Sequence, residues 1–419
     1  MIPWSRIDRA AAAALDEVDP LRERRGEFAV PPGVIYLDGN SLGALPRAVP
    51  GRIEAVLKEQ WGQGLVRSWN GAGWIDLPAR VGARIARLVG ARADEVIVAD
   101  STSINVFKLL AAALELQPRR RVILSEDGNF PTDLYMAQGL CGLTGRAELR
   151  LVRTEAGSDA VLDAIDEDVA VVMLTQVDFR TGRRHDLQAM TARAHEGGAL
   201  VLWDLAHSAG AFPVHLNEAR ADFAVGCGYK YLNGGPGAPA FLYVRQDLQE
   251  RARQPLSGWM GHARPFHFVN GYEPAAGIAR HLCGTPTILS LAALDAALDA
   301  FDGVDMAVLR EKSVSLMETF IARVEAEATA LGLALASPRE AERRGSQVSY
   351  RHPEGYAIMQ ALIAAGVIGD FRAPDILRFG FTPLYLSHAE VFDAAELLCE
   401  VIRTRRFERP EFHRRALVT

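Results

Sequence analysis

The sequence predicts an α/β protein with a large domain built on a mainly parallel sheet and a smaller α+β domain at the C-terminal end. The chain has 419 residues, more than one core usually holds, so two closely packed domains are expected. Short apolar segments alternate with amphipathic ones from about residue 47 to 300, the rhythm of strands and covering helices. From about residue 286 long amphipathic helices replace this alternation.

We therefore divide the chain into an N-terminal segment (1–46) that joins the small domain, a large domain (47–290) and a small domain (291–419). The N-terminal segment is expected to hold a helix within residues 1–32, ending in the extended pair Pro31-Pro32. A short strand follows at 34–37 and ends in the turn residues Asp38-Gly39-Asn40. We see no low-complexity linker, so any ligand should lie between the two domains.

In the large domain the expected strands are nearly all apolar, as strands buried on both faces must be. They cover residues 96–99, 121–124, 170–174, 199–203, 221–225 and 240–244, with helices at 104–116 and from Thr132 onward. In the small domain we expect helices at 287–302, 306–332, 355–365 and 388–405, and strands at 346–350 and 376–381.

Composition narrows the class of protein. A net charge of −6 and a pI near 6.0 argue against a surface that binds nucleic acid. The four cysteines form no CxxC pair, which fits a reducing compartment and argues against a cysteine-based zinc site. The histidines follow no metal-binding spacing, and no apolar run reaches the length of a membrane span. We expect a cytoplasmic protein without a metal.

Asp204 follows the apolar strand 199–203, and in an open parallel sheet ligands bind at the carboxyl ends of the strands. A carboxylate buried there needs a cationic partner or a ligand cation. Capping of the next helix by Asp204 explains the residue equally well when it is considered alone.

Lys230 lies 26 residues further on, between a predicted strand and the glycine-rich run 234–237. A lysine held at a strand end can lose its proton readily, as a Schiff-base lysine must. Together the two residues match the needs of pyridoxal phosphate (PLP), which requires a lysine for its aldehyde and an acid against its ring nitrogen.

The cofactor also needs a site for its phosphate. Residues 100–103 (Asp-Ser-Thr-Ser) lie between a core strand and a helix, where free backbone N–H groups and the positive end of the helix dipole favour an anion. The same residues could act only as a helix cap.

The order of these motifs resembles the aspartate aminotransferase superfamily (fold type I) and, within it, the kynureninase family, most closely its bacterial members. The segments that carry the resemblance extend over nearly the whole chain. They are 36–43, 66–70, 130–133, 203–210, 229–237 and 378–385.

The resemblance implies hydrolysis of L-kynurenine to anthranilate and L-alanine, in tryptophan breakdown or in a biosynthetic route to anthranilate. It gives catalytic roles to Lys230, which would bond the cofactor and move the Cα proton, to Tyr229 as a proton donor, and to Asp204. It also implies cofactor contacts by Thr102, Ser103, Phe130, Pro131, Thr132, Asp133, Thr175, Asp204, His207, Tyr229, Lys230, Trp259 and Thr285.

Substrate contacts follow in the same way. The family pattern assigns Arg378 to the substrate α-carboxylate, which a guanidinium binds through two hydrogen bonds. Trp69, Ser68 and Asn40 complete the expected substrate set. In the family Trp259 and Thr285 reach the neighbouring subunit's site, so a homodimer is expected. Animal members carry Asn in place of Thr285 and act on 3-hydroxykynurenine, so we expect unsubstituted kynurenine to be preferred here.

Two alternatives remain open at this point. A cysteine desulfurase or related β-lyase shares the fold, but it needs a mobile reactive cysteine, and Cys399 lies in an apolar helical segment. A catalytically silent PLP-fold binding protein is the other alternative, and the presence of both Asp204 and Lys230 argues against it.

Overall fold

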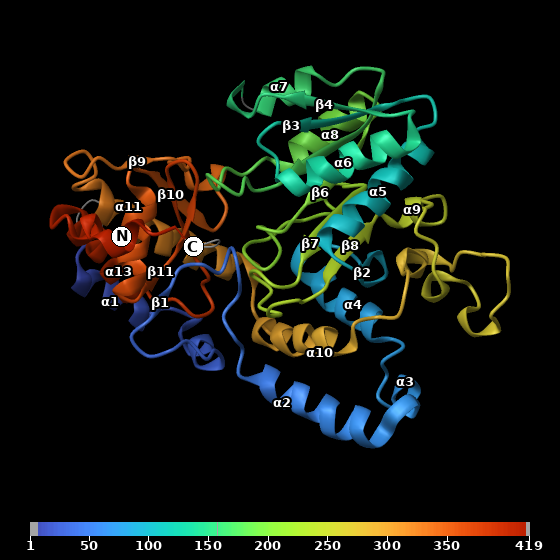
Figure 1. Cartoon of the computed structure of the whole chain (residues 1–419), viewed down its shortest axis with the longest axis horizontal. Coiled ribbons are helices and arrows are strands. Elements are labelled where there is room, and N and C mark those ends of the chain that lie inside the picture. The colour runs from blue at the N-terminus through green and yellow to red at the C-terminus, as the bar shows by residue number, and fades with distance from the viewer. Residues whose placement is uncertain (1–6, 157, 416–419) are drawn as a thin grey trace.

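The computed structural model describes residues 7–156 and 158–415, which form two lobes (Figure 1). The large lobe is built on a seven-stranded sheet with the order β2-β8-β7-β6-β5-β3-β4. Its strands are β2 (Val96–Val98), β3 (Val122–Glu126), β4 (Glu148–Val152), β5 (Val169–Thr175), β6 (Leu200–Asp204), β7 (Phe223–Cys227) and β8 (Ala240–Val244). The strands from β4 to β7 run parallel, while β8 and β2 are antiparallel to their neighbours, so the predicted mainly parallel sheet is confirmed.

Two apolar layers cover the faces of this sheet. One contains α5 (Thr102–Leu116) and α6 (Pro131–Thr144), which pack on side chains such as Ile123 and Val171. The other contains α4 (Leu77–Val89), α8 (Leu187–Glu196) and α10 (Ile288–Ala297), with the intervening strand residues such as Val172. From residue 171 to 174, successive residues of β5 point to opposite layers, which explains its uninterrupted apolar sequence.

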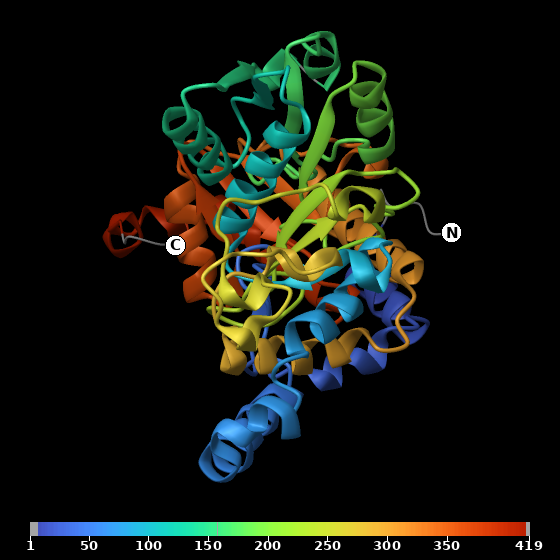
Figure 2. The same cartoon turned by 90° about the vertical axis from the view of Figure 1, so that its right-hand side faces the viewer.

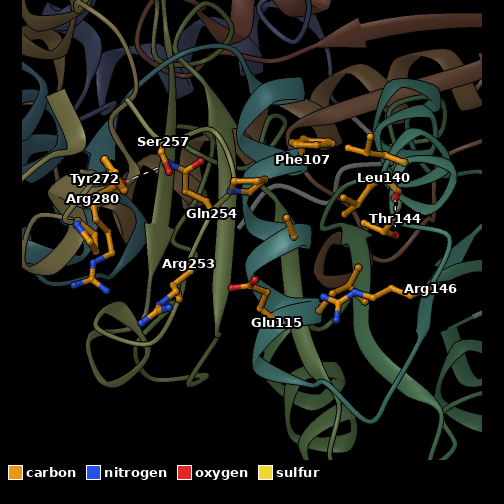
Figure 3. A pocket seen from close by; sticks show the side chains of 16 residues that line it. Phe107, Glu115, Leu140, Thr144, Arg146, Arg253, Gln254, Ser257, Tyr272 and Arg280 are labelled. Carbon is orange, nitrogen blue, oxygen red and sulfur yellow. Dashed lines mark hydrogen bonds between the residues drawn. The ribbon is translucent and has the colours of Figure 1, made fainter. Parts of the chain in front are cut away.

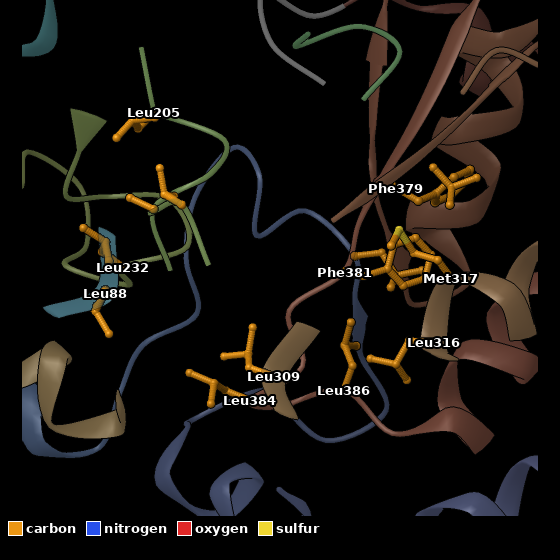
Figure 4. Close-up of a cluster of buried hydrophobic side chains, with 14 of the residues drawn as sticks. Leu88, Leu205, Leu232, Leu309, Leu316, Met317, Phe379, Phe381, Leu384 and Leu386 are labelled. Atoms are coloured by element: carbon orange, nitrogen blue, oxygen red, sulfur yellow. The ribbon is translucent and has the colours of Figure 1, made fainter. Parts of the chain in front are cut away.

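The small lobe holds an antiparallel sheet with the order β12-β13-β10-β9. Its strands are β9 (Ala334–Leu335), β10 (Gln347–Arg351), β12 (Asp370–Arg372) and β13 (Ile376–Gly380), and its helices are α11 (Met306–Glu325), α12 (Gly355–Ala364) and α13 (His388–Arg403). Figure 4 shows Leu316, Met317, Phe379 and Phe381 meeting in its core. The same apolar cluster continues to Leu205 and Leu232 of the large lobe, so the two lobes share buried surface.

The beginning of the chain lies with the small lobe. β1 (Ile35–Tyr36) pairs in parallel with β11 (Val367–Ile368). The helix α1 (Arg9–Glu17) packs near α13, and Asp16 accepts hydrogen bonds from the backbone N–H groups of His388 and Ala389 at 2.7 and 3.0 Å. Residues in the range 9–36 thus contact the small lobe. Residues 1–6 of the predicted N-terminal segment lie outside the described residues, and the domain boundaries at 46 and 290 stay predictions.

A helical arm precedes the sheet and projects from the large lobe (Figure 2). It consists of α2 (Ala48–Ala55), the π-helix η3 (Val56–Gly64) and α3 (Ser68–Gly71). The remaining α-helices are α7 (Ser158–Asp163) and α9 (Gln246–Gln249). Within residues 7–156 and 158–415, no helix has the length and apolar character needed to cross a membrane.

Three predicted helix boundaries are wrong. The helix predicted at 306–332 ends at Glu325, since the chain turns at 326–331 and passes through Gly332 (φ 67°) to bring β9 beside β10. The helix predicted at 104–116 begins at Thr102, because Ser101 accepts from the N–H of Ile104 and caps it there. The helix predicted at 287–302 is regular only to Ala297 and ends in a 3₁₀ turn.

Candidate active site

Asp204 and Lys230 lie at the carboxyl ends of the neighbouring strands β6 and β7 and line one cavity. Asp204 is the last residue of β6 and is 4% exposed, and its Oδ1 accepts a hydrogen bond from the N–H of Ala206 at 2.8 Å. Lys230 follows β7 in a half-buried turn. The sheet thus brings the two residues together, as strand-end placement predicts.

Most of the cofactor residues expected from the sequence line the same cavity. The lining consists of Ser101, Thr102, Ser103, Phe130, Thr132, Asp133, Thr175, Phe179, Asp204, Ala206, His207, Tyr229 and Lys230. Five segments supply them, namely the starts of α5 and α6 and the carboxyl ends of β5, β6 and β7 with the residues that follow. Pro131 is the first residue of α6 and does not line the cavity.

The floor of the cavity is an unusual acidic pair. Asp133, in the first turn of α6, is 2% exposed and hydrogen-bonds with Asp204. Burial, followed by repulsion from Asp204, raises the pKa of Asp133 well above its ordinary value. Burial also raises the pKa of Asp204, while the Lys230 ammonium opposes that rise. Both shifts favour the protonated form of the pair, which suits it to share a proton with a ring nitrogen.

His207 adds a neutral group to this floor. It is 4% exposed, and burial followed by repulsion from Lys230 lowers its pKa well below its ordinary value. Its Nδ1 and the Oδ2 of Asp133 are buried and have no hydrogen-bond partner among the described residues. Buried polar atoms normally have partners, so these two atoms are suited to a polar ligand.

Aromatic side chains form the wall beside Lys230. Its Nζ lies 5.8 Å from the ring centroid of Phe130 and 5.8 Å from that of Tyr229. Phe179, which the sequence did not single out, meets Phe130 edge-on with centroids 5.3 Å apart. Burial raises the pKa of the Tyr229 hydroxyl, which therefore keeps its proton at neutral pH. A planar aromatic group fits between such walls.

The start of α5 provides the anion site. Thr102 and Ser103 lie in its first turn, where backbone N–H groups have no partner within the helix. Asp100 adopts φ 50° to turn the chain from β2 into this helix. Beneath the turn, Lys108 is fully buried, pairs with Asp100 and donates to the carbonyl of His281 at 2.7 Å.

The remaining predicted residues lie outside this lining. Arg378 and Asn40 are buried between β13 and the N-terminal segment, and Ser68 and Trp69 lie in the arm. Trp259 is 36% exposed and contacts Phe266 and Phe268, and Thr285 is exposed. Their assigned roles stay predictions.

A larger cavity of about 470 Å³ lies beside α5 and α6 (Figure 3). Phe107 and Leu140 give it apolar walls, and Glu115 and Arg146 stand at its edge. None of the residues predicted from the sequence lines it, so the chemistry belongs to the cavity at Lys230.

Comparison with known protein structures shows the fold. A cysteine desulfurase from Thermococcus onnurineus matches with a TM-score of 0.74 over 91% of this chain and 98% of its own, at 18% identity. A cysteine desulfurase from Escherichia coli matches with a TM-score of 0.75 over 92% of this chain and 98% of its own, at 20% identity. At such identities the likeness establishes the architecture only, which is that predicted from the sequence.

Comparison of sequences shows the family. Residues 309–398 match the family described as kynureninase C-terminal domain. The kynureninase of Pseudomonas fluorescens is 55% identical over 97% of this chain and 98% of its own length. A kynureninase of Burkholderia mallei is 54% identical over 98% of this chain and 99% of its own. Identity of this extent over both full lengths shows that the chain belongs to the kynureninase family.

Proposed function

We propose that this chain hydrolyses the Cβ–Cγ bond of L-kynurenine, consuming one water and releasing anthranilate and L-alanine. The chain is an enzyme of the hydrolase class that uses pyridoxal phosphate. The observation that carries the proposal is the placement of Lys230, Asp204 and the start of α5 around one cavity. Family membership then selects this reaction among those that the fold supports.

The donor set of the cavity fits the cofactor. Lys230 would hold its aldehyde carbon, and Asp204, supported by Asp133, would face its ring nitrogen. Thr102 and Ser103 would bind its phosphate with hydroxyl and backbone N–H groups. Phe130 would lie against the ring, while His207 would offer its unpartnered Nδ1. When bound, the cofactor supplies a sink for the electron pair left on the substrate when a bond to Cα or the Cβ–Cγ bond breaks.

Two residues move protons in the proposed reaction. The Nζ of Lys230, once displaced by the substrate amine, takes the proton from Cα. The Tyr229 hydroxyl, which burial keeps protonated, gives a proton to Cβ after anthranilate leaves. Water adds to the γ-carbonyl before the Cβ–Cγ bond breaks, so the bond electrons pass to the alanine part and the oxygen remains on anthranilate.

Substrate contacts are proposed from the family pattern. Arg378 would bind the α-carboxylate, with Asn40 beside it. Trp69, Ser68 and Thr285 would shape the aromatic pocket and favour unsubstituted kynurenine over its 3-hydroxy form.

We further propose a homodimer with shared active sites. Large apolar side chains are exposed on the arm (Trp61, 56%), on the loop before η9 (Gly277–His281) (Phe268, 77%) and at the start of α10 (Leu289, 41%). A groove lined partly by Trp61 and Leu289 joins the arm to α10. Apolar surface of this kind is typical of subunit interfaces. We also propose a cytoplasmic location, which the four free thiols support.

The test of the function is anthranilate fluorescence with kynurenine and 3-hydroxykynurenine side by side. We expect turnover of both and the higher kcat/KM for kynurenine. Lys230→Ala should abolish turnover, because among the described residues no other side-chain amine lines this cavity and could bond the cofactor aldehyde. Lys58→Ala, in an exposed pair with Glu54, is the matched control. Steady-state anthranilate release by Lys230→Ala would refute the role of this lysine, and inactivity of the wild-type enzyme toward both substrates would refute the function.

A further inference from the structure

A buried ion cluster lies where the N-terminal segment meets the small lobe. Asp370 of β12 and Arg378 of β13 are directly opposite each other in the antiparallel register, and both are 2% exposed. Cross-strand partners of this kind have their side chains on the same face. The carboxylate and the guanidinium form a two-point pair, from Nε to Oδ1 at 2.6 Å and from Nη2 to Oδ2.

The other end of the guanidinium has neutral partners. The Nη1 of Arg378 donates to the carbonyl of Phe179 at 2.6 Å, and its Nη2 donates to the hydroxyl of Ser41 at 2.7 Å. Ser41 in turn donates to Oδ2 of Asp370 at 2.7 Å, which closes a triangle of hydrogen bonds. Asp370 therefore fixes one edge of Arg378, while a carbonyl and a hydroxyl occupy the edge formed by Nη1 and Nη2.

This division of partners suits the recognition of a carboxylate. A charged acceptor binds a guanidinium more strongly than a carbonyl or hydroxyl does, and it binds best through two parallel N–H groups. Nη1 and Nη2 provide such a pair once their hydrogen bonds to the Phe179 carbonyl and the Ser41 hydroxyl are broken. Asp370 cannot be replaced as easily, because its own charge would be left buried.

The cluster also keeps positive charge available. Arg372 forms a second ion pair with Oδ2 of Asp370 at 2.8 Å, so the guanidinium groups of Arg372 and Arg378 share this carboxylate. Asp38 is the other acidic group nearby, and burial followed by repulsion from Asp370 raises its pKa to about 7. With Asp38 protonated, the two arginines exceed the single carboxylate by one charge.

We propose that Asp370, together with Ser41, is the positioning group for Arg378, and that the substrate α-carboxylate displaces the Phe179 carbonyl and the Ser41 hydroxyl while Asp370 keeps its two bonds. This inference rests on the proposed function, in which Arg378 binds the substrate carboxylate. Phe179 connects the cluster to the active site, since its ring lines the cavity and meets Phe130.

The test compares ligands that differ only in the carboxylate. The holoenzyme is titrated with L-alanine and with ethylamine, which is alanine without its carboxylate, and binding is followed by the cofactor absorbance. In Asp370→Asn we expect the Kd for L-alanine to rise roughly 10- to 100-fold, since a misaligned guanidinium loses its two-point contact. The Kd for ethylamine should stay within about twofold, because ethylamine makes no contact that depends on Arg378.

The control is Asp375→Asn, because Asp375 pairs with the exposed Arg351 at 3.2 Å and lies between the same two strands. It should change neither Kd. If Asp370→Asn does not fold, Asp370→Glu decides with the same two ligands, since the longer side chain keeps the charge but shifts the two-point pair with Arg378. In that variant we expect the L-alanine Kd alone to rise.

Other results would overturn the inference. Tighter binding of L-alanine by Asp370→Asn would mean that Asp370 competes with the substrate, and an equal rise for both ligands would mean a general loss of structure. The titration uses no kynurenine, so its outcome is independent of the anthranilate assay that tests the function.

Discussion

At the scale of single residues, Asp38 should give this protein a marked dependence of stability on pH. Its half-buried carboxyl has a pKa of about 7, against an ordinary value of 3.8. The folded state therefore holds a proton between about pH 4 and 7 that the unfolded chain has lost. The free energy of unfolding consequently falls as pH rises through this window, and the loss is complete above the folded-state pKa.

We predict that Asp38→Asn removes this slope and stabilises the protein above pH 7, by on the order of 2 kcal/mol, given some remaining contact with solvent. Thermal unfolding of both proteins between about pH 4 and 8 measures the effect. The Tm difference should be small near pH 4, grow up to about pH 7 and stay constant above it. A difference that is independent of pH would show that Asp38 does not titrate in this range.

At the scale of elements, the turn from β2 into α5 depends on a buried cation. Lys108 fixes Asp100, the residue with positive φ, and also holds the carbonyl of His281. We predict that Lys108→Met destabilises the protein by about 3 kcal/mol, the usual cost of breaking a buried ion pair, and weakens cofactor phosphate binding.

Thermal unfolding and a titration with pyridoxal phosphate would measure both effects of Lys108→Met. Arg150→Met is a suitable control, since it removes a more exposed pair with Asp166. Equal losses in the two variants would indicate that Lys108 contributes nothing particular to the turn.

The elements also show what a sequence can predict. The central strands could be predicted because both their faces are buried, so each appears in the sequence as a continuous run of apolar residues. β4 was missed, since its residues Glu148–Val152 alternate and lie partly exposed at the sheet edge. β11 and β12 were missed because they have two and three residues and form only through distant partners.

The same distinction applies to the site. Asp204 and Lys230 were predicted because strand ends are recognisable from local sequence, and the ends of parallel strands meet. Phe179 and Asp370 carry no local signal. Phe179 depends on the path of the chain after β5, and Asp370 depends on its register with Arg378. Asp370 and Arg378 are eight residues apart, and this spacing becomes informative only once a hairpin between them is assumed.

At the scale of the whole molecule, we predict that active sites are completed between subunits. Lys230→Ala and Trp259→Ala should each be inactive or severely impaired alone. When the two are mixed under conditions of subunit exchange, a mixed dimer has one site with both defects and one with neither. Random exchange should therefore restore about a quarter of wild-type activity, since half of the dimers are mixed and each has one intact site.

Sedimentation before and after mixing would confirm the assembly state, and anthranilate release would report the recovery. Lys230→Ala mixed with Lys230→Ala/Trp259→Ala is the control, because none of its mixed dimers has an intact site. Absence of recovery in the first mixture, with exchange demonstrated, would contradict shared sites.

The pairing of β1 with β11 has a consequence for how the chain is made. The strand partners of residues 35 and 36, at 367 and 368, leave the ribosome 332 residues later (367 − 35). The strands of the large sheet, all between residues 96 and 244, are available long before that. The large lobe can therefore assemble before β1 of the N-terminal segment has its partner strand β11, since domains fold as units during translation. Tyr36 and its neighbours remain without their strand partners while the large sheet is made, and the lobe that contains Arg378 is completed after that sheet.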